Sequence, residues 1–306
     1  MSTVRSSSRQ ESMTLPPPQD AGLLLIALAG ISASGPLMAA TAAPALAIAF
    51  WRNAFGAGFT AALTVVRSRR EWAQVGRRGW LLAVLAGIFL ALHFGTWVPS
   101  VKFTSVASAT GLVATQSIFT GLIAAASGRR LPRAAWFGIA LAFLGTLFIA
   151  GADLHVSVRA VTGDGLATLG GLFAASYVTV GGHARRVLST AIYTIICYSV
   201  CALALLVACL AGGQPLGGYP ARAWLYLALV TVAAQLLGHS LINVVLRSAS
   251  ATFVSLAVLL EVPGAAIIAY FWLHQHPPVW AYPGLGLLAV GLVMVVRAGA
   301  RAADID

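Results

Sequence analysis

Ten long apolar segments follow one another along the chain and are separated by short polar stretches. Each segment is continuously hydrophobic rather than alternating, and each is near the roughly 20 residues that an α-helix needs to cross a bilayer. Transmembrane strands would instead alternate over shorter runs. The pattern therefore predicts an all-α polytopic membrane protein with ten transmembrane helices. The segments lie at about 22–43, 45–66, 79–98, 104–126, 133–150, 163–181, 190–211, 222–245, 252–272 and 279–297.

The composition supports a membrane protein. Hydrophobic residues make up 59% of the 306 residues and charged residues only 9%, with a mean hydropathy of +0.88. A soluble domain carries about 25% charged residues. A net charge of +11 would suggest a nucleic-acid partner in a soluble chain. Here the arginines sit in short loops between apolar segments, so the lipid bilayer is the expected surroundings and no nucleic-acid partner is predicted.

The positive residues also predict the orientation. With the N-terminus in the cytoplasm, 15 Lys and Arg residues fall in cytoplasmic segments, and 3 fall in outside loops, namely Lys102, Arg159 and Arg222. Positive residues are enriched in cytoplasmic loops. We therefore expect a multi-pass protein of the cell inner (cytoplasmic) membrane with both termini in the cytoplasm. The polar residues 1–21, which include three consecutive prolines, are predicted to form a disordered cytoplasmic tail.

Two stretches of the chain share landmarks at one spacing. Lys102 corresponds to Arg247, and Gln116 corresponds to Glu261, both at an offset of 145 residues. A glycine pair with a spacing of seven follows each stretch, namely Gly138 with Gly145 and Gly284 with Gly291. The matches predict that the chain is an internal duplication.

The duplication divides the chain into a first repeat over 22–150 and a second over 163–298. Five segments in each repeat is an odd number, so the second copy enters the membrane from the opposite side and the repeats are inverted. The loop after the fourth segment, GRRLPR, is rich in arginine, whereas the corresponding HQHPPVW after the ninth has no Lys or Arg. Inverted repeats with broken helices and a midplane site are typical of secondary transporters.

A known family shares the motifs of the second repeat. They are the run from Ser248 to Thr252, then Leu260-Glu261-Val262-Pro263, a proline after the ninth segment and Gly-x6-Gly in the tenth. With these the chain resembles the drug/metabolite transporter superfamily, with two EamA-type repeats over about 22–298. It is most similar to the YddG-type exporters of aromatic and other neutral amino acids. That resemblance implies ten helices, a cytoplasmic N-terminus and a central cavity between the repeats.

The first repeat departs from this pattern. The proline that usually follows the position of Gln116 is missing, and Ile118 and Phe119 occupy that region. The first half of the site is therefore expected to differ from the second.

Few polar side chains lie within the apolar segments, and these are candidates for the cavity. His93 and Trp97 share one helical face, where imidazole and indole suit an aromatic zwitterion. Trp97 could instead belong to an interfacial aromatic belt. Polar residues at 235, 239 and 243 form a stripe that should face the bundle interior, for cavity contact or for helix–helix hydrogen bonds alone. The substrate-binding candidates are His93, Trp97, Thr115, Gln116, Tyr177, His239 and Asn243.

Glu261 is a carboxylate in the middle of the ninth segment, where a charge is costly. It is expected either to couple transport to a proton gradient or to serve as a structural partner beside Pro263 and Gly264, which weaken the helix. Pro36 in the first segment predicts a gate or a packing kink. Arg52 is expected toward the outer face, holding a helix end or snorkelling, and its pairing with Glu261 is the alternative.

Several catalytic motifs are missing from the sequence. A phosphate-binding GxxxxGK[ST] loop, an HExxH helix and a GxSxG elbow are all absent, so neither ATP-driven transport by this chain alone nor an enzyme is predicted. The three cysteines fall within one apolar segment and suit buried structural positions. No metal and no cofactor are expected.

These observations predict a secondary transporter or facilitator that exports aromatic and other neutral amino acids across the inner membrane by alternating access. One alternative is an exporter of another neutral metabolite or a cationic drug, proton-coupled through Glu261. A second alternative, from another class, is a lipid-handling or structural membrane component with a sealed interior. A monomer is compatible with the sequence.

Overall fold

The computed structural model describes residues 15–64, 69–127, 132–153, 157–276, 279 and 281–303. Most of the predicted tail, residues 1–14, lies outside them. Every secondary-structure element in the described part is helical. The elements are α1 (Pro18–Ser32), α2 (Ser34–Ala40), α3 (Ala45–Thr64), α4 (Arg69–Trp72), α5 (Arg77–Phe103), α6 (Val106–Val113), α7 (Gln116–Ala126), α8 (Arg133–Asp153), α9 (Val158–Arg185), α10 (Thr190–Ala211), α11 (Ala221–Val230), the π-helix η1 (Thr231–His239), α12 (Ser240–Val245), α13 (Ala251–Ala257), the 3-10 turn η2 (Val258–Leu260), α14 (Glu261–Leu273) and α15 (Ala281–Ala303).

Each predicted apolar segment coincides with one continuous helix or one interrupted helix. Seven of these are long and apolar enough to cross a membrane, which agrees with a polytopic membrane protein. Those seven candidate spans are Pro18–Ala40, Arg77–Phe103, Val106–Ala126, Val158–Arg185, Thr190–Ala211, Ala221–Val245 and Phe253–Leu273. For the segments that form α3, α8 and α15, crossing of the membrane stays a prediction.

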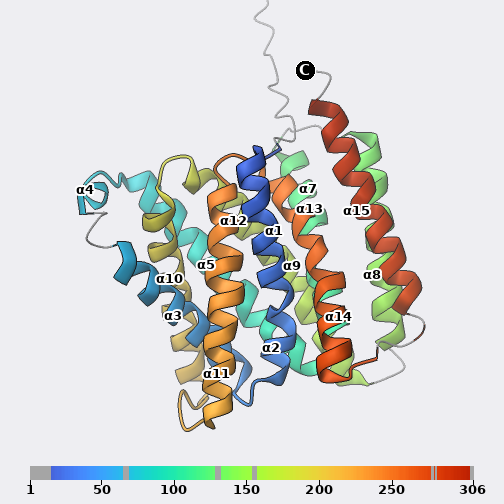
Figure 1. The fold of residues 1–306 in the computed structure, drawn as a ribbon, viewed down its shortest axis with the longest axis horizontal. Helices are drawn as coiled ribbons and strands as arrows, with labels where there is room; N and C mark the ends of the chain where they lie inside the picture. The colour runs from blue at the N-terminus through green and yellow to red at the C-terminus, as the bar shows by residue number, and fades with distance from the viewer. Residues whose placement is uncertain are drawn as a thin grey trace, which may run out of the picture.

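The helices run side by side and form one bundle (Figure 1). Helix α1 begins and α15 ends at the same end of the bundle, which we call the terminal end; the other is the distal end (Figure 1). Large apolar side chains point outward on many helices, for example Leu25, Leu81 and Phe271, which are 66%, 65% and 73% exposed. An exposed apolar surface of this kind suits lipid rather than water.

Two of the interrupted helices contain a proline at the same place. Helix α2 starts after the cap residue Ala33, and α14 starts after Leu260; in each, the proline is the third residue of the new helix, Pro36 or Pro263. Proline has no N–H to bond the carbonyl four residues back, and its ring crowds that carbonyl. The turn before each proline is therefore where the helix is interrupted.

The first repeat is interrupted at the corresponding position without a proline. Helix α6 ends at Val113 and α7 begins at Gln116. The Thr115 hydroxyl donates to the carbonyl of Leu112 at 2.7 Å, which satisfies a backbone group that the break releases. The missing proline therefore does not prevent a break, because α7 begins at Gln116 as α14 begins at Glu261.

The two glycine pairs found in the sequence pack against each other. A Cβ added at Gly291 would lie 2.5 Å from the carbonyl oxygen of Gly138, and one added at Gly145 would lie 2.5 Å from that of Gly284. Helices α8 and α15 therefore touch backbone to backbone, which only glycine permits. The earlier glycine of each helix meets the later one of the other, so the two helices run antiparallel and exchange places under a two-fold rotation.

We predict that Gly291→Ala destabilises the protein. Its Cβ would also approach the Ala142 amide nitrogen at 2.7 Å, so α8 and α15 must separate. Overpacking of this kind costs about 1–3 kcal/mol. The matched control is Gly286→Ala on the same helix, where a Cβ would meet nothing within 4 Å. Thermal unfolding in detergent should show a lower Tm for Gly291→Ala only, and equal values for both variants would contradict the close packing.

Candidate functional site

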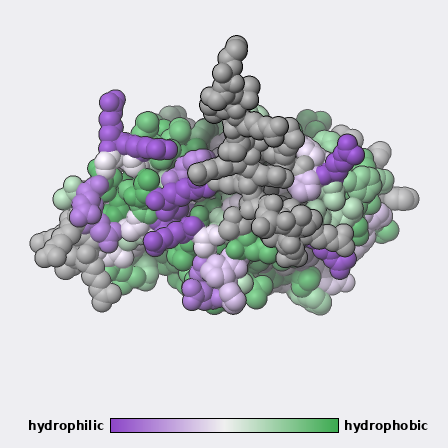
Figure 2. All heavy atoms as spheres, turned by 90° about the horizontal axis from the view of Figure 1, so that it is seen from above, coloured by the Kyte–Doolittle hydropathy of each residue, from purple (hydrophilic) through white to green (hydrophobic). Residues whose placement is uncertain are grey.

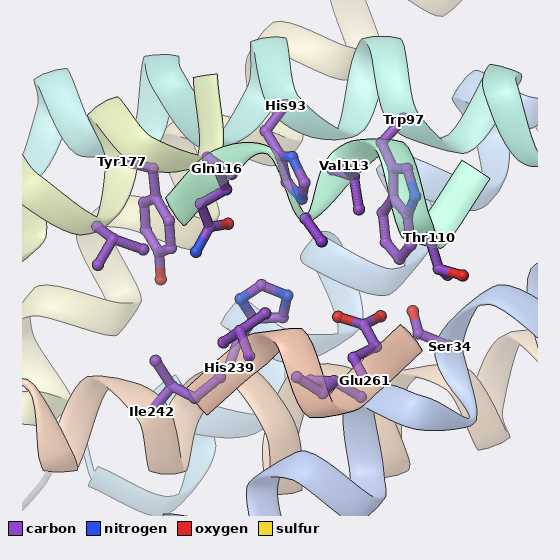
Figure 3. A pocket seen from close by; sticks show the side chains of 15 residues that line it. Ser34, His93, Trp97, Thr110, Val113, Gln116, Tyr177, His239, Ile242 and Glu261 are labelled. Carbon is purple, nitrogen blue, oxygen red and sulfur yellow. The ribbon is translucent and has the colours of Figure 1, made fainter. Parts of the chain in front are cut away.

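A cavity of about 40 Å³ lies in the middle of the bundle, where the interrupted helices meet. Its lining comes from the first repeat and the second in nearly equal parts. The lining residues are Ile31, Ser34, His93, Trp97, Thr110, Val113, Ala114, Gln116, Ala174, Tyr177, Val178, His239, Ile242, Val258 and Glu261. Glu261, Ser34 and Thr110 gather at one end of it, and Gln116 and Tyr177 lie at the other (Figure 3).

Six of the polar or charged residues selected from the sequence are brought together in this lining. They are His93, Trp97, Gln116, Tyr177, His239 and Glu261. Two other candidates, Thr115 and Asn243, are buried nearby but do not line the cavity. The Thr115 hydroxyl donates a hydrogen bond within the α6–α7 break. The Asn243 side chain forms hydrogen bonds to tyrosines on other helices.

Helix α5 contributes His93 and Trp97, which stack with ring centroids 5.5 Å apart and an angle of 15° between the planes. The His93 Nδ1 atom lies 3.0 Å from the carbonyl oxygen of Gly170. A carbonyl only accepts, so Nδ1 carries the hydrogen, and Nε2 of the neutral ring is an acceptor. Trp97 is only 2% exposed, which excludes the interfacial belt, and its Nε1 donates to no described residue.

The three polar residues of the predicted stripe all lie in the bundle interior. Gln235 and His239 belong to the π-helix η1, and Asn243 belongs to α12. Gln235 turns toward α3, where its Nε2 donates to Asn53 Oδ1 at 3.0 Å. His239 turns into the cavity. The stripe was expected to face the interior, for cavity contact or for helix–helix hydrogen bonds, and the structure contains both uses.

Asn243 joins three helices instead of facing the cavity. Its Oδ1 accepts from the Tyr177 hydroxyl at 2.9 Å, and its Nδ2 donates to the Tyr198 hydroxyl at 3.4 Å. Its backbone carbonyl accepts from Arg185 Nε at 2.9 Å. Tyr177, which lines the cavity, is thereby fixed by a residue behind it.

Arg52 lies within the bundle and is fully buried, not toward the outer face as the sequence suggested. Its Nε donates to Gln235 Oε1 at 3.0 Å, and its Nη1 donates to Ser34 Oγ at 3.1 Å. The guanidinium also lies over the ring of Phe94, with 4.2 Å from Cζ to the centroid. Arginine tolerates this position because its planar fork can reach two acceptors and stack on an aromatic ring at once.

Glu261 is the first residue of α14 and is 7% exposed. Its Oε1 atom is buried and accepts no hydrogen bond from any residue that the structure describes. The Nε and Nη1 atoms of Arg52 donate to Gln235 and Ser34. Its Nη2 atom also lacks a hydrogen-bond partner among the described residues. The alternative in which Arg52 pairs directly with Glu261 is therefore not what the structure contains.

The two proline-interrupted helices touch beside the cavity. A Cβ added at Gly264 would lie 2.7 Å from Ser32 Cβ and closer still to Ser32 Oγ. Gly264 thus allows the start of α14 to pack on the end of α1. Pro36 is buried, whereas Pro263 is exposed. The breaks therefore meet through Ser32 and Gly264 rather than through the prolines.

Hydrogen bonds between different segments of the chain lie on both sides of the cavity, toward the two ends of the bundle. Toward the terminal end, Thr120 and Ser255 hydrogen-bond at 3.0 Å, and beyond them lies a polar cavity of about 280 Å³ that includes Arg247. Toward the distal end, Lys102 Nζ donates to the carbonyl of Thr41 at 2.6 Å and to that of Ala39 at 3.2 Å.

Three polar residues near the cavity were not selected from the sequence. Thr110 lines the cavity, and Thr120 and Ser255 hydrogen-bond to each other between helices. Single hydroxyl residues in apolar segments usually hydrogen-bond to the backbone of their own helix. A Ser or Thr in such a segment therefore does not by itself indicate a position at the cavity. The repeat does give one hint, because Thr110 and Ser255 are separated by the same 145 residues as Gln116 and Glu261.

The model of one protein family matches this chain twice, and that family is described as the EamA-like transporter family. The matches cover residues 20–151 and 161–297. A protein of known crystal structure, whose description names no activity, is similar with a TM-score of 0.69 and 16% identity. The similarity covers 92% of this chain and 98% of that one, and at this identity it shows the fold alone. No curated protein matches the sequence.

We predict that Arg52→Lys lowers the stability of the folded protein. Lysine keeps the charge but is a single point donor, so it cannot serve Gln235 and Ser34 together. Losing a partner of a buried charge costs about 3–5 kcal/mol. The control is Arg222→Lys, since Arg222 is exposed and bonds only the Tyr226 hydroxyl among the described side chains. An unchanged Tm for Arg52→Lys in detergent would show that the network is not structural.

Proposed function

This chain belongs to the EamA-like transporter family, and from that premise we propose that it exports aromatic and other neutral amino acids across the inner membrane by alternating access. The central cavity carries the proposal. It lies between the two repeats, and its lining combines aromatic faces with mostly neutral polar groups. Such a lining suits a neutral, partly apolar solute better than an anion. The polar groups are not all consumed by helix–helix bonds, which argues against a sealed structural component.

The small size of the cavity supports alternating access. About 40 Å³ holds one or two water molecules, since each takes about 30 Å³ in the liquid, and not an amino acid. In this proposal the Thr120–Ser255 bond serves as the closure on one side, and the Lys102 bonds serve as the closure on the other. Opening one closure at a time would admit the solute from one side and release it on the other.

The geometry of the repeats favours two inverted halves of five helices each around this cavity. Helices α8 and α15 exchange places under a two-fold rotation through their glycine pairs. Helices α6–α7 and α13–α14 are interrupted directly before Gln116 and Glu261. Repeats of this kind are related by an axis in the membrane plane and surround a midplane site.

The distribution of positive residues favours a cytoplasmic terminal end. Arg186 and Arg247 lie near that end, whereas Lys102, Arg159 and Arg222 lie near the distal end. Hydrophilic side chains project from several places on the terminal end among hydrophobic ones (Figure 2). Under the positive-inside rule this distribution favours cytoplasmic termini.

A second candidate is an exporter of another neutral metabolite or a cationic drug, proton-coupled through Glu261. The observation that favours it is the buried carboxylate, whose Oε1 has no hydrogen-bond partner among the described residues. Such a group can exchange a proton for a cationic substrate.

We predict that proteoliposomes containing the protein take up labelled phenylalanine without a pH gradient, well above empty liposomes. Threonine tests the range of neutral amino acids, and a cationic dye tests the second candidate. Flux of the dye alone, and only with a pH gradient, would refute the amino-acid proposal and favour proton coupling. Flux of none of the three would refute both.

We predict that Lys102→Met opens the distal end of the cavity. The substitution removes the donor to Ala39 and Thr41. A charge-assisted hydrogen bond of about 1.5 kcal/mol corresponds to roughly a tenfold shift in population. The readout uses a cysteine introduced by Val113→Cys, at a buried position of the cavity lining. We measure the rate at which a membrane-impermeant thiol reagent, applied from the distal side, modifies this cysteine.

Lys102→Arg is the matched control, because it keeps a charged donor. The three native cysteines are buried and give the same background in every variant. Equal rates in Lys102→Met and Lys102→Arg would show that these bonds do not hold the end closed.

A further inference from the structure

The central cavity has unequal chemistry at its two ends, and this bears on which molecules it binds. One end carries the carboxylate of Glu261 together with the hydroxyls of Ser34 and Thr110 (Figure 3). The other end carries the amide of Gln116 (Figure 3). His239 lies between them with a buried Nδ1 that makes no hydrogen bond to a described residue. An acceptor end and a donor end therefore face each other across aromatic side chains.

The Glu261 end is built to receive a cation. A buried carboxylate is costly unless it is paired, and the structure gives Oε1 no protein donor among the described residues. The Thr110 hydroxyl donates to the carbonyl of Val106 at 2.6 Å. Its lone pairs remain available, so this hydroxyl can accept from a ligand N–H. An ammonium group has three donors, which suits a carboxylate flanked by such an acceptor.

The charge balance disfavours a ligand with only one charge while Glu261 is ionised. Arg52 reaches Ser34 at the Glu261 end of the cavity, and the charges of Arg52 and an ionised Glu261 sum to zero. A zwitterion leaves that sum at zero. An amine without a carboxylate would leave an unbalanced positive charge in a site of low dielectric, and a carboxylate alone would leave a negative one.

The donor end supplies a place for the negative group of a zwitterion. No described residue bonds the Gln116 side chain, which is buried at the cavity wall. Its NH₂ group can donate to a carboxylate, and so can a ring nitrogen of His239. The stacked rings of His93 and Trp97 offer an apolar face to the body of the ligand.

We propose that Glu261 binds the ammonium group of a zwitterionic amino acid, while Gln116 and His239 bind its carboxylate. This inference rests on the proposed function and adds the polarity of the bound molecule. Glu261 is then a binding residue rather than only a partner at a helix break. Because the present cavity is small, the contacts form when the bundle opens around the ligand.

The test is binding of three related probes to purified wild-type protein in detergent, measured by calorimetry. L-Phenylalanine carries both charged groups, phenethylamine lacks the carboxylate, and N-acetylphenylalanine lacks the ammonium. We expect phenylalanine to bind at least about tenfold more tightly than either of the others, since each loses a charge-assisted contact. N-Acetylphenylalanine or phenethylamine binding as tightly as phenylalanine would overturn the proposal.

The matched variants are Glu261→Gln and Glu71→Gln. Both remove one negative charge with almost no change of shape, but Glu71 is exposed in α4, far from the cavity. Phenylalanine affinity should fall at least about tenfold in Glu261→Gln and stay unchanged in Glu71→Gln. Unchanged affinity in a folded Glu261→Gln would overturn the proposal, and if that variant does not fold, the three probes on the wild type decide.

Failure of this inference is distinguishable from failure of the proposed function. If phenylalanine does not bind to the wild-type protein and is not taken up by proteoliposomes that contain it, the proposed amino-acid function itself is refuted. If phenylalanine is transported but Glu261→Gln or acetylation of the amine leaves its binding unchanged, the function stands and the role of Glu261 fails.

Discussion

The guanidinium of Arg52 connects the two halves of the protein at their centre. It lies in the first half and donates to Gln235 of the second, while its other arm reaches Ser34 beside the cavity. Placing a permanent charge there is expensive, and the cost is offset only when its donors find acceptors. Gln235 of the π-helix η1 meets this requirement, because its Oε1 accepts from Arg52 while its Nε2 donates to Asn53. His239 of the same π-helix lines the cavity.

The interrupted helices follow from a second requirement of the same kind. Backbone groups freed by a break must be satisfied inside the protein, because lipid offers no hydrogen bonds. The structure therefore gathers its breaks at the centre. There, the Thr115 hydroxyl donates to the carbonyl of Leu112. Gly264 has no side chain, so α14 can pack closely against Ser32. Irregular backbone and polar side chains are concentrated in one place, and that place is the cavity.

Much of this site could be predicted from the sequence, because a polar residue in an apolar segment has few alternatives. His93 and Trp97 share a face by spacing alone, and the offset between Gln116 and Glu261 foretold their corresponding positions. The depth of Arg52 was not predictable, since a short apolar context does not say how far a helix end lies from the surface. The register change in η1 was also hidden. The π-helix packs against α1 and α3, and the hydrophobic pattern along the chain does not distinguish a π-helix from an α-helix.

The two halves differ at many corresponding positions, among them the central pair Gln116 and Glu261 and the outer pair Lys102 and Arg247. In a perfectly symmetric inverted duplicate, exchanging the conformations of the halves would turn the inward-open state into the outward-open state, and the two would have equal energy. These substitutions remove that degeneracy. Without solute or gradient, the protein should then populate either the inward-open or the outward-open state more than the other. The inward-to-outward and outward-to-inward transitions would therefore proceed at different rates.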